Sequence, residues 1–501
     1  MAEDFRDRLR RLRRDEDAAA PPPARRGAGM PGWLRDRLER QRARDAGDGL
    51  EHGTRELDGA AGPAGGLRRT RAVARSSGPG SGRSGPGRSG PSRPRTSGEP
   101  RDLAVRTRAE GVFAERVILR QDTERHGTWR LADVDGAGDF DLVARDPALA
   151  DLAPRRAVYL DIETTGLSGG AGTWPFLVAL GRYTDDGAFE LWQGFLREPG
   201  EERAMLAEVA DRIAAGDAVV SFFGKAFDKT RLEDKLRQHR LPSPFPDRPH
   251  LDLYHPLNRL YTRRAQWERL ASPAAGRVAP PPGAGFGDGR LCTMETELCG
   301  LVRDDDLPGS FAPEAWFDFL ADRPHLLEAI FDHNADDVWS LATLTAHLGR
   351  TLAEAAPDGA PLAGPCLARA LGVASLYRDR ADRTAERAWL DRARARLEGA
   401  EPRGLALWRA DAARLAGDKA GALAMYDDLA GDDDALGPRL HLERAKLLEH
   451  HARDHAGALA ACEAARAAAL RFLGGRASVR FLADLDHRAE RLRGKLAAGG
   501  A

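Results

Sequence analysis

The 501-residue sequence contains few residues that could cross-link it or anchor it in a membrane. Its four cysteines show no C-x-x-C pair and no zinc-type spacing; they are Cys292, Cys299, Cys366 and Cys462. We therefore expect reduced thiols in a cytoplasmic protein. No apolar run reaches membrane-spanning length, and the N-terminus lacks the apolar segment of a signal peptide. These absences argue against a membrane partner.

Lysine is also scarce, with Lys225 the first in the chain, so arginine supplies most of the 76 basic residues. These balance 77 acidic residues at a formal net charge of −1, and no overall field favours a polyanion. Locally the balance is uneven, because Gly66 to Gly98 holds eight arginines and no acid. The Pro, Gly, Ser and Arg content of the N-terminal part predicts a disordered tail over residues 1–100. Two short helices are expected within it, near Phe5 and Trp33. The arginines of this tail either contact phosphates or are simply solvated.

The next segment, residues 101–154, holds short β-prone pieces at Val112–Val117 and Asp139–Val143, which predict an accessory strand layer. Residues 155–352 then alternate strand and helix patterns. Strands are expected around Val158–Ile162 and over Trp174–Leu180, Phe189–Phe195 and Ala218–Phe223, and helices over Glu201–Ala214, Lys229–His239 and Pro324–Leu348. The glycine-rich stretch LSGGAGT after the first strand favours a tight antiparallel connection over a phosphate loop, because it has no P-loop lysine.

Residues 365–498 read as almost wholly helical and contain an internal repeat. The sequence DKAGALA at 418–424 recurs as DHAGALA at 454–460, an offset of 36 residues. This is close to the tetratricopeptide period of about 34 residues. We therefore expect a TPR-like helical domain that either binds a protein partner or covers one face of the preceding domain.

The stretch AVYLDIETTG at 157–166 places two acids, Asp161 and Glu163, two positions apart on a β-prone run. Side chains at i and i+2 of a strand point to the same face. Two neighbouring carboxylates repel each other and need counter-charges, for which divalent cations with oxygen ligands are suited. The alternative is an exposed strand end with two solvated acids.

Further acids occur at Asp228, between a strand and a helix, and at Asp337, four residues after His333. Alone, Asp228 reads as a helix N-cap, and the His–Asp pair as a surface hydrogen bond on one helix face. Together with Asp161 and Glu163, these acids can hold two divalent cations for phosphodiester hydrolysis. His333 would then orient or deprotonate the attacking water.

Five blocks in this order resemble the bacterial YprB-type RNase H-like domain family, within the DEDD group of 3′–5′ exonucleases. They are YLDIETTGLSGGAGTWPFLVALGRY, VVSFFGKAFDKTRL, HLDLYHPLNRLY, CTMETELCGLVRDDDLPGSFAP and FDHNADDVWSLATL, within residues 155–352. The resemblance implies an α/β domain, an RNase H-like mixed β-sheet flanked by helices, between the disordered tail and the all-α helical-repeat-like domain.

The resemblance also implies site residues. Two Mg²⁺ or Mn²⁺ ions would be held by Asp161, Glu163, Asp228 and Asp337, with His333 completing the catalytic set. The terminal nucleotide would lie near Thr164, Thr165, Gly166 and Leu167, and a basic cluster at Arg259, Arg263 and Arg264 is expected to contact the phosphate backbone. His250 and Asp252 are expected to be structural.

Two positions depart from the DEDD pattern. Phe223 stands where such enzymes usually carry Asn, and His333 lies four rather than five residues before Asp337, as in the YprB-type family.

The function that follows is a metal-dependent 3′–5′ exonuclease acting on single-stranded DNA or RNA. One alternative is a nucleic-acid-binding scaffold with little turnover, which Phe223 favours and the intact acid set opposes. A weaker one is an RNase H or resolvase-type endonuclease, against which the closely spaced D-x-E argues.

Overall fold

The computed structural model describes residues 100–166, 173–262, 283–303, 307, 309–323, 325–431, 434–473 and 475–499. The chain divides into two units, Met1–Ser97 and Gly98–Ala501, and the described residues all belong to the second. The expected N-terminal tail with its two helices lies outside the described residues, as do Leu167, Arg263 and Arg264.

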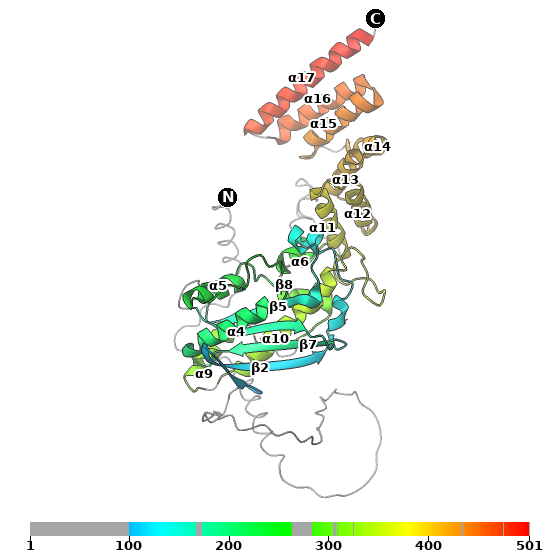
Figure 1. Cartoon of the computed structure of the whole chain (residues 1–501). Coiled ribbons are helices and arrows are strands. Elements are labelled where there is room, and N and C mark those ends of the chain that lie inside the picture. Colours follow the sequence, from blue (N-terminus) through cyan, green and yellow to red (C-terminus); the bar gives the residue numbers. More distant parts are fainter. Residues whose placement is uncertain are drawn as a thin grey trace, which may run out of the picture. The chain divides into compact units, whose positions relative to one another are not determined.

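A seven-stranded sheet forms the centre of the first part of the described chain (Figure 1). Its strands, in spatial order, are β1 (Ala104–Arg108), β2 (Gly111–Gln121), β7 (Ala188–Phe195), β6 (Pro175–Tyr183), β5 (Ala157–Thr164), β8 (Ala218–Ser221) and β9 (His250–Asp252). Strands β5, β8 and β9 run parallel to one another, whereas the pairs from β1 to β5 are antiparallel. The sheet is therefore mixed, and β5 and β6 are joined as the antiparallel pair that the glycine-rich stretch favoured.

Seven α-helices accompany this sheet within the described residues. They are α3 (Phe140–Ala144), α4 (Glu202–Ala214), α5 (Asp228–Gln238), α6 (Tyr254–Tyr261), α8 (Leu291–Cys299), α9 (Ala312–Leu320) and α10 (Leu327–Leu348). Short 3₁₀ turns are η1 (Leu131–Val134), η2 (Pro147–Leu149), η3 (Pro154–Arg156), η4 (Pro199–Glu201) and η6 (Gly309–Phe311), and β3 (Arg125–His126) pairs with β4 (Trp129–Arg130).

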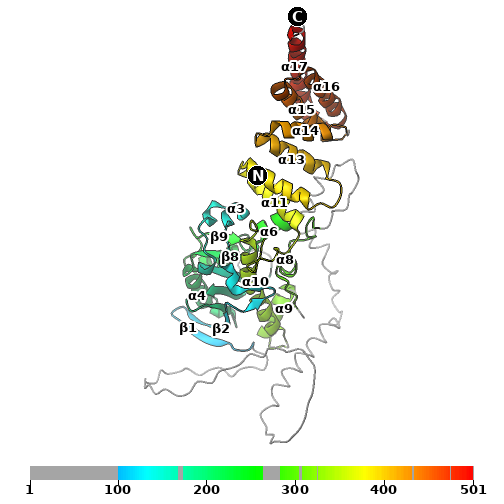
Figure 2. The same cartoon turned by 90° about the vertical axis from the view of Figure 1, so that its right-hand side faces the viewer.

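Helices α4 and α10 cover opposite faces of the sheet (Figure 2). Two consecutive residues of β7 show this, because neighbouring side chains on a strand point to opposite faces. The ring of Trp192 lies 4.6 Å from the guanidinium of Arg212 on α4. Gln193 donates instead to Oδ1 of Asn334 on α10, at 2.9 Å. The face covered by α10 also carries the acids discussed below.

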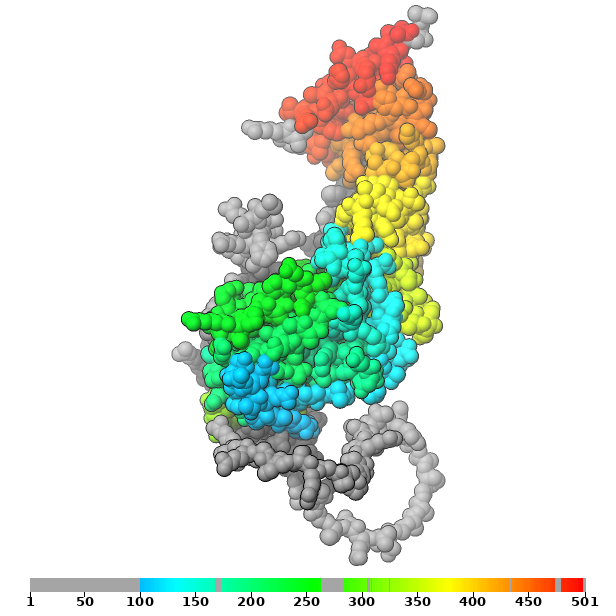
Figure 3. Space-filling view, viewed as in Figure 1, coloured from blue at the N-terminus to red at the C-terminus, as the bar shows by residue number. Residues whose placement is uncertain are grey.

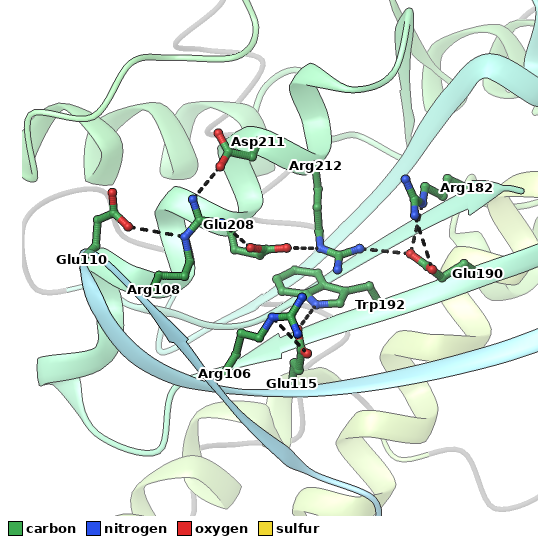
Figure 4. Close-up of polar contacts among 10 residues, drawn as sticks. All are labelled: Arg106, Arg108, Glu110, Glu115, Arg182, Glu190, Trp192, Glu208, Asp211 and Arg212. Atoms are coloured by element: carbon green, nitrogen blue, oxygen red, sulfur yellow. Dashed lines mark hydrogen bonds and ion pairs between the residues drawn. The ribbon is translucent and has the colours of Figure 1, made fainter. Parts of the chain in front are cut away.

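Ion pairs and hydrogen bonds fix α4 to the strands beneath it (Figure 4). Arg108 on β1 contacts Glu208 and Asp211 on α4. Glu208 also accepts from Arg212 at 2.7 Å, and the Trp192 indole N–H donates to Glu115 on β2 at 2.8 Å. This network holds the edge strand β1 in register with the helix.

Two expectations for residues 101–154 are wrong. This segment is not a separate strand layer, since β2 pairs directly with β7 and so extends the main sheet. Asp139–Val143 is not a strand but contributes to the short helix α3, which buries Phe140, Leu142 and Val143. A short apolar run of this length does not distinguish a buried strand from a buried helix.

The rest of the described chain is helical. Its helices are α11 (Cys366–Asp379), α12 (Arg383–Ala395), α13 (Arg403–Leu415), α14 (Lys419–Leu429), α15 (Gly437–Leu447), η7 (Leu448–Ala452, a π-helix), α16 (His455–Phe472) and α17 (Gly475–Gly499). The core of the sheet domain continues into α11–α13. Arg380 donates to Asp141 on α3 at 2.7 Å. At the surface, the yellow helical segment after the sheet domain lies directly against the cyan part of that domain (Figure 3). None of the helices in the described ranges combines the length and the apolar character that crossing a membrane requires.

The sequence repeat has a structural counterpart in helix N-caps. Asp382, Asp418 and Asp454 lie 36 residues apart, and each accepts a hydrogen bond from the backbone N–H three residues later, at 3.0, 2.9 and 2.8 Å. Each therefore begins the second helix of a pair, at α12, α14 and α16. The period includes a third copy that the sequence comparison missed. Assignment to the TPR family stays a prediction.

We predict that two buried histidines make the fold acid-sensitive. His126 contacts the Ser340 hydroxyl at 2.8 Å and His347 the Tyr261 hydroxyl at 2.9 Å, and burial lowers the pKa of each to about 3. The unfolded chain takes up these protons near pH 6.5 but the folded chain does not. Above pH 6.5 neither histidine reduces the free energy of unfolding. As the pH falls from 6.5 toward 3, each histidine lowers the free energy of unfolding by up to about 1.4 kcal/mol per pH unit.

The melting temperature measured at pH 7, 6 and 5 checks this. The variant carrying both His126→Gln and His347→Gln should show a shallower fall than the native chain, while His451→Gln at an exposed position should not differ from it. An equal fall in all three proteins would contradict the prediction.

Candidate functional site

The candidate site lies where the parallel strands β5, β8 and β9 end. Asp161 and Glu163 are on β5, and Asp228 is the first residue of α5, which follows β8. The carboxyl ends of adjacent parallel strands open onto a common crevice, the usual ligand position in open α/β sheets. Asp337 reaches the same place from α10. The four acids predicted as metal ligands are thus contributed by three separate elements.

Burial and mutual repulsion act strongly on these acids. Burial raises the pKa of Asp228 well above its usual range, and repulsion by Asp161, Asp252, Glu163 and Asp337 raises it further. The pKa of Asp161 is raised in the same way, by burial and then by Asp337. A set of carboxylates that destabilise one another's charge in this way favours a bound cation.

Asp228 is not a helix N-cap, so that alternative from the sequence is wrong. Phe227 occupies the N-cap position and Asp228 is the first helical residue, only 6% exposed. The preceding turn packs tightly around it. A Cβ added to Gly224 would lie 2.4 Å from the Ser221 hydroxyl and 2.8 Å from an Asp228 carboxylate oxygen, so this position requires glycine.

A buried chain of hydrogen bonds orients Asp161. Arg116 Nε donates to Gln193 Oε1 at 2.8 Å, Gln193 Nε2 donates to Asn334 Oδ1 at 2.9 Å, and Asn334 Nδ2 donates to Asp161 Oδ2 at 2.7 Å. Gln193 and Asn334 are fully buried. Because arginine can only donate, it fixes the orientation of both amides. The chain therefore presents a donor to Asp161.

Arg303 places a positive charge among the acids. It lies just after α8, and its guanidinium contacts Asp337 Oδ1 at 2.5 Å and Glu295 on α8. A third contact, to His333 Nδ1, is 3.3 Å long. An arginine only donates, so Nδ1 accepts and Nε2 of His333 carries the hydrogen. Nε2 lies 4.0 Å from Glu163 Oε1 and 3.7 Å from Asp337 Oδ2.

The residues present fit magnesium or manganese in chemistry. Asp161, Glu163, Asp228 and Asp337 offer only hard oxygen donors, which Mg²⁺ and Mn²⁺ prefer. Within the part of the chain that the structure describes, no three His, Cys, Asp or Glu side chains already stand at metal-binding geometry. The expectation of a magnesium or manganese site therefore rests on the four oxygen ligands and on their buried negative charge. Arg303 offsets only part of that charge.

The remaining predicted residues are placed as follows. Thr164 donates to the Gly166 carbonyl at 3.0 Å, and the Thr165 hydroxyl accepts from Trp174 N at 2.9 Å, so the end of β5 is a closed turn beside the acids. Arg259, on α6, donates to the Val143 carbonyl at 2.7 Å and so faces α3. Its contact with a phosphate stays a prediction.

His250 and Asp252 have the structural contacts expected of them. His250 Nε2 lies 2.7 Å from the Ser221 hydroxyl. Asp252 accepts from the backbone N–H groups of Phe223 at 2.7 Å, Lys225 at 3.1 Å and Tyr254 at 3.2 Å. It thereby ties the turn after β8 to the start of α6.

Sequence reasoning missed Arg303, Glu295, Gln193 and Asn334. Asn334 had a signal, since it is a polar residue beside His333, one turn of the same helix from Asp337 and next to the apolar positions Ile330, Phe331 and Val338. Gln193 had none, because its partner Asn334 lies 141 positions away. Arg303 and Glu295 are only eight residues apart, but nothing in that spacing indicates the contact of Arg303 with Asp337.

Comparison with known proteins agrees with this fold. A family model described as the RNase H superfamily matches residues 158–349. Residues 158–349 are an RNase H superfamily domain. The chain is also 32% identical over 197 residues, 39% of its length, to the Bacillus subtilis (strain 168) protein named Uncharacterized protein YprB. The match covers 42% of that protein, so the chain spans less than half of its length.

These matches confirm the RNase H-like, YprB-type assignment made from the five sequence blocks. The mixed sheet with flanking helices and the C-terminal helical region agree with the predicted fold class. An RNase H-like domain has a nuclease-like fold, and the matched region contains all four acids and His333.

We predict that divalent cations stabilise the native chain through these acids. Saturating Mn²⁺ or Mg²⁺ should raise the melting temperature, since a ligand at a hundred times its Kd adds about 2.7 kcal/mol. Asp228→Asn removes one repelling charge, so it should keep or raise the melting temperature without metal and abolish most of the rise with metal.

Asp234→Asn, at an acid of α5 that pairs with Arg237 at 2.8 Å, is the control and should respond to metal like the native chain. An equal metal-dependent rise in Asp228→Asn and the native chain would argue against the site.

We predict that Gln193→Leu weakens metal binding from a distance. It leaves Arg116 Nε and Asn334 Oδ1 without this partner, at a cost of about 1–3 kcal/mol for each buried group, and frees Asn334 to turn away from Asp161. Mn²⁺ affinity, measured by calorimetry, should fall roughly 10–100-fold. Gln121→Leu at an exposed position of β2 should bind Mn²⁺ normally. Unchanged affinity in Gln193→Leu would show that the hydrogen-bond chain does not position Asp161.

Proposed function

We propose that this protein is a metal-dependent nuclease of the DEDD type, a 3′–5′ exonuclease that hydrolyses phosphodiester bonds of single-stranded nucleic acid. The observation that carries the proposal is the convergence of four acids on the carboxyl ends of the parallel strands, three of them at least nine-tenths buried. A structural role would leave this repulsion only partly offset, by Arg303 and Asn334, whereas a phosphodiesterase uses it to hold cations.

Asp161, Glu163, Asp228 and Asp337 would hold two Mg²⁺ or Mn²⁺ ions. Such ions, when bound, activate a water and stabilise the leaving oxygen of a phosphodiester. The chain itself supplies orientation. Asn334 keeps one oxygen of Asp161 occupied, so the other remains available to a ligand.

His333 would act on the attacking water. With Nδ1 accepting from Arg303, its Nε2–H points toward the space beside Glu163 and Asp337. This tautomer suits orienting the water by a hydrogen bond better than removing its proton. Gly309 lies beside this group, since a Cβ there would stand 3.6 Å from His333 Nε2, an ordinary contact distance.

The substrate strand would end near β5. Thr164, Thr165 and Gly166 lie at the end of β5, beside the acids. The basis for proposing a terminal nucleotide here and attack from a 3′ end is the resemblance to DEDD exonucleases.

A binding scaffold with little turnover is the second candidate, and one observation favours it. Arg303 pairs with Asp337, which is 9% exposed, and so occupies one of the four acids. If this ion pair persisted in the presence of divalent cations, the chain would bind nucleic acid without efficient hydrolysis.

Digestion of end-labelled single strands tests the proposal. DNA and RNA strands with free or blocked 3′ ends would be incubated with Mn²⁺, Mg²⁺ or EDTA. The native chain should produce a ladder that requires metal and a free 3′ end, and Asp161→Ala should reduce it to background because one ligand to the cations is lost.

Asp234→Ala on α5 serves as the matched control and should cleave like the native chain. Cleavage by a folded Asp161→Ala variant would refute the site. Strand binding without cleavage by the native chain would favour the scaffold.

A further inference from the structure

A cluster of aromatic rings lies at the same sheet edge as the acids. Phe222 and Phe223 follow β8, and Tyr254 and His255 follow β9. Tyr254 packs against the rings of both phenylalanines, with centroids 5.6 and 4.9 Å away, and His255 lies 5.3 Å from Tyr254 and 6.3 Å from Phe223. The turn that leads to Asp228 follows β8, and the rings of the cluster follow β8 and its parallel neighbour β9.

Phe223 differs from its neighbour in both conformation and packing. Its φ of 61° is in the left-handed region, which a bulky L-residue rarely adopts. Phe222 packs against the main core of the described residues. The ring contacts described for Phe223 are instead with the half-buried Tyr254 and the exposed His255, and Phe223 is itself half-buried. The chain thus holds a large apolar side chain outside the core in a strained backbone conformation.

Asp252 maintains this conformation. Its carboxylate, only 4% exposed, accepts from the N–H groups of Phe223 and Lys225 on either side of Gly224. Gly224 is the residue whose added Cβ would lie 2.8 Å from an Asp228 oxygen. Phe223 is therefore one residue away from a point of close contact with a predicted metal ligand.

Basic groups follow Phe223 in the chain, with Lys225 two residues and Lys229 six residues later. Both line a hollow of about 380 Å³ together with Arg248, His250, Asp146 and Asp247. Lys225 Nζ lies 3.3 Å from Asp146, and the buried Nδ1 of His250 has no hydrogen-bond partner among the described residues. Cations next to partly exposed aromatic rings are the combination that binds single strands, because bases stack and phosphates are neutralised.

We propose that Phe223, supported by Tyr254 and His255, is a base-stacking platform for single-stranded nucleic acid. It binds a base of the strand whose phosphodiester lies at the acids, with the phosphate backbone passing toward Lys225 and Lys229. The proposal rests on the proposed function and gives its substrate class a specific contact. It also assigns a role to the phenylalanine that stands where related enzymes usually have asparagine.

A purely structural role for Phe223 predicts a different outcome. If its ring stabilised the fold, its removal would lower the melting temperature. Asparagine tolerates the left-handed region, so Phe223→Asn relieves backbone strain while it removes the ring. As a platform, Phe223→Asn should melt at the native temperature or above and bind nucleic acid less tightly.

The test measures binding of 12-nucleotide DNA and RNA strands with free 3′ ends to the full chain, by fluorescence anisotropy, in EDTA to prevent metal-dependent cleavage. One set of strands is complete, and each further strand lacks one base near the 3′ end. Native protein and the variants Phe223→Asn, Phe223→Leu and Phe472→Leu are compared, the last at an exposed phenylalanine of α16.

For the complete strand, loss of the Phe223 ring should weaken binding about tenfold, and Phe472→Leu should have no effect. One of the abasic strands will lack the base that stacks on Phe223. The native protein and the Phe223 variants should bind that strand equally, because the stacked base is already missing. Two results would overturn the platform while leaving the nuclease proposal intact. One is equal affinity of all proteins for the complete strand; the other is that the Phe223 variants bind every abasic strand more weakly than the native protein, and by the same factor. No binding and no metal-dependent cleavage by the native chain would overturn both.

Discussion

Repulsion between buried carboxylates is the constraint on which the organisation of this domain depends. Asp161, Glu163, Asp228 and Asp337 are brought together by β5, the β8–α5 connection and α10, and burial raises the pKa of Asp161 and Asp228. A fold that assembles such a group loses stability unless positive charge or hydrogen-bond donors compensate. The surrounding structure supplies both, each from a different direction.

The hydrogen-bond donor to Asp161 comes from the buried core, and the positive charge comes from Arg303 in the segment after α8. The chain from Arg116 through Gln193 and Asn334 crosses from β2 to β5 without reaching solvent, so it orients Asp161 rigidly. Arg303 offsets part of the charge of Asp337 and Glu295, and it fixes the tautomer of His333. The acids are thus held ready for cations of higher charge. Buried ion pairs contribute little net stability, so such an arrangement is better explained by a function.

Local sequence patterns predicted much of this arrangement. The D-x-E pair was expected on one strand face, and both residues indeed face α10; the strand expected at Trp174–Leu180 is β6, Pro175–Tyr183. Contacts between distant residues could not be predicted. Gln193 and Asn334 are 141 positions apart, and nothing in either local pattern indicates the other. Asp139–Val143 was wrongly expected to be a strand because five residues are too few to establish a period.

The most direct test of the account is a crystal structure of the full chain grown with Mn²⁺, with anomalous scattering used to locate the metal. The account predicts anomalous density bonded to Asp161 and shared with Glu163, Asp228 or Asp337, and a longer Arg303–Asp337 distance than the present 2.5 Å. Density found only at other surface acids, with Arg303 still paired to Asp337, would contradict the claim that these four carboxylates form a metal site.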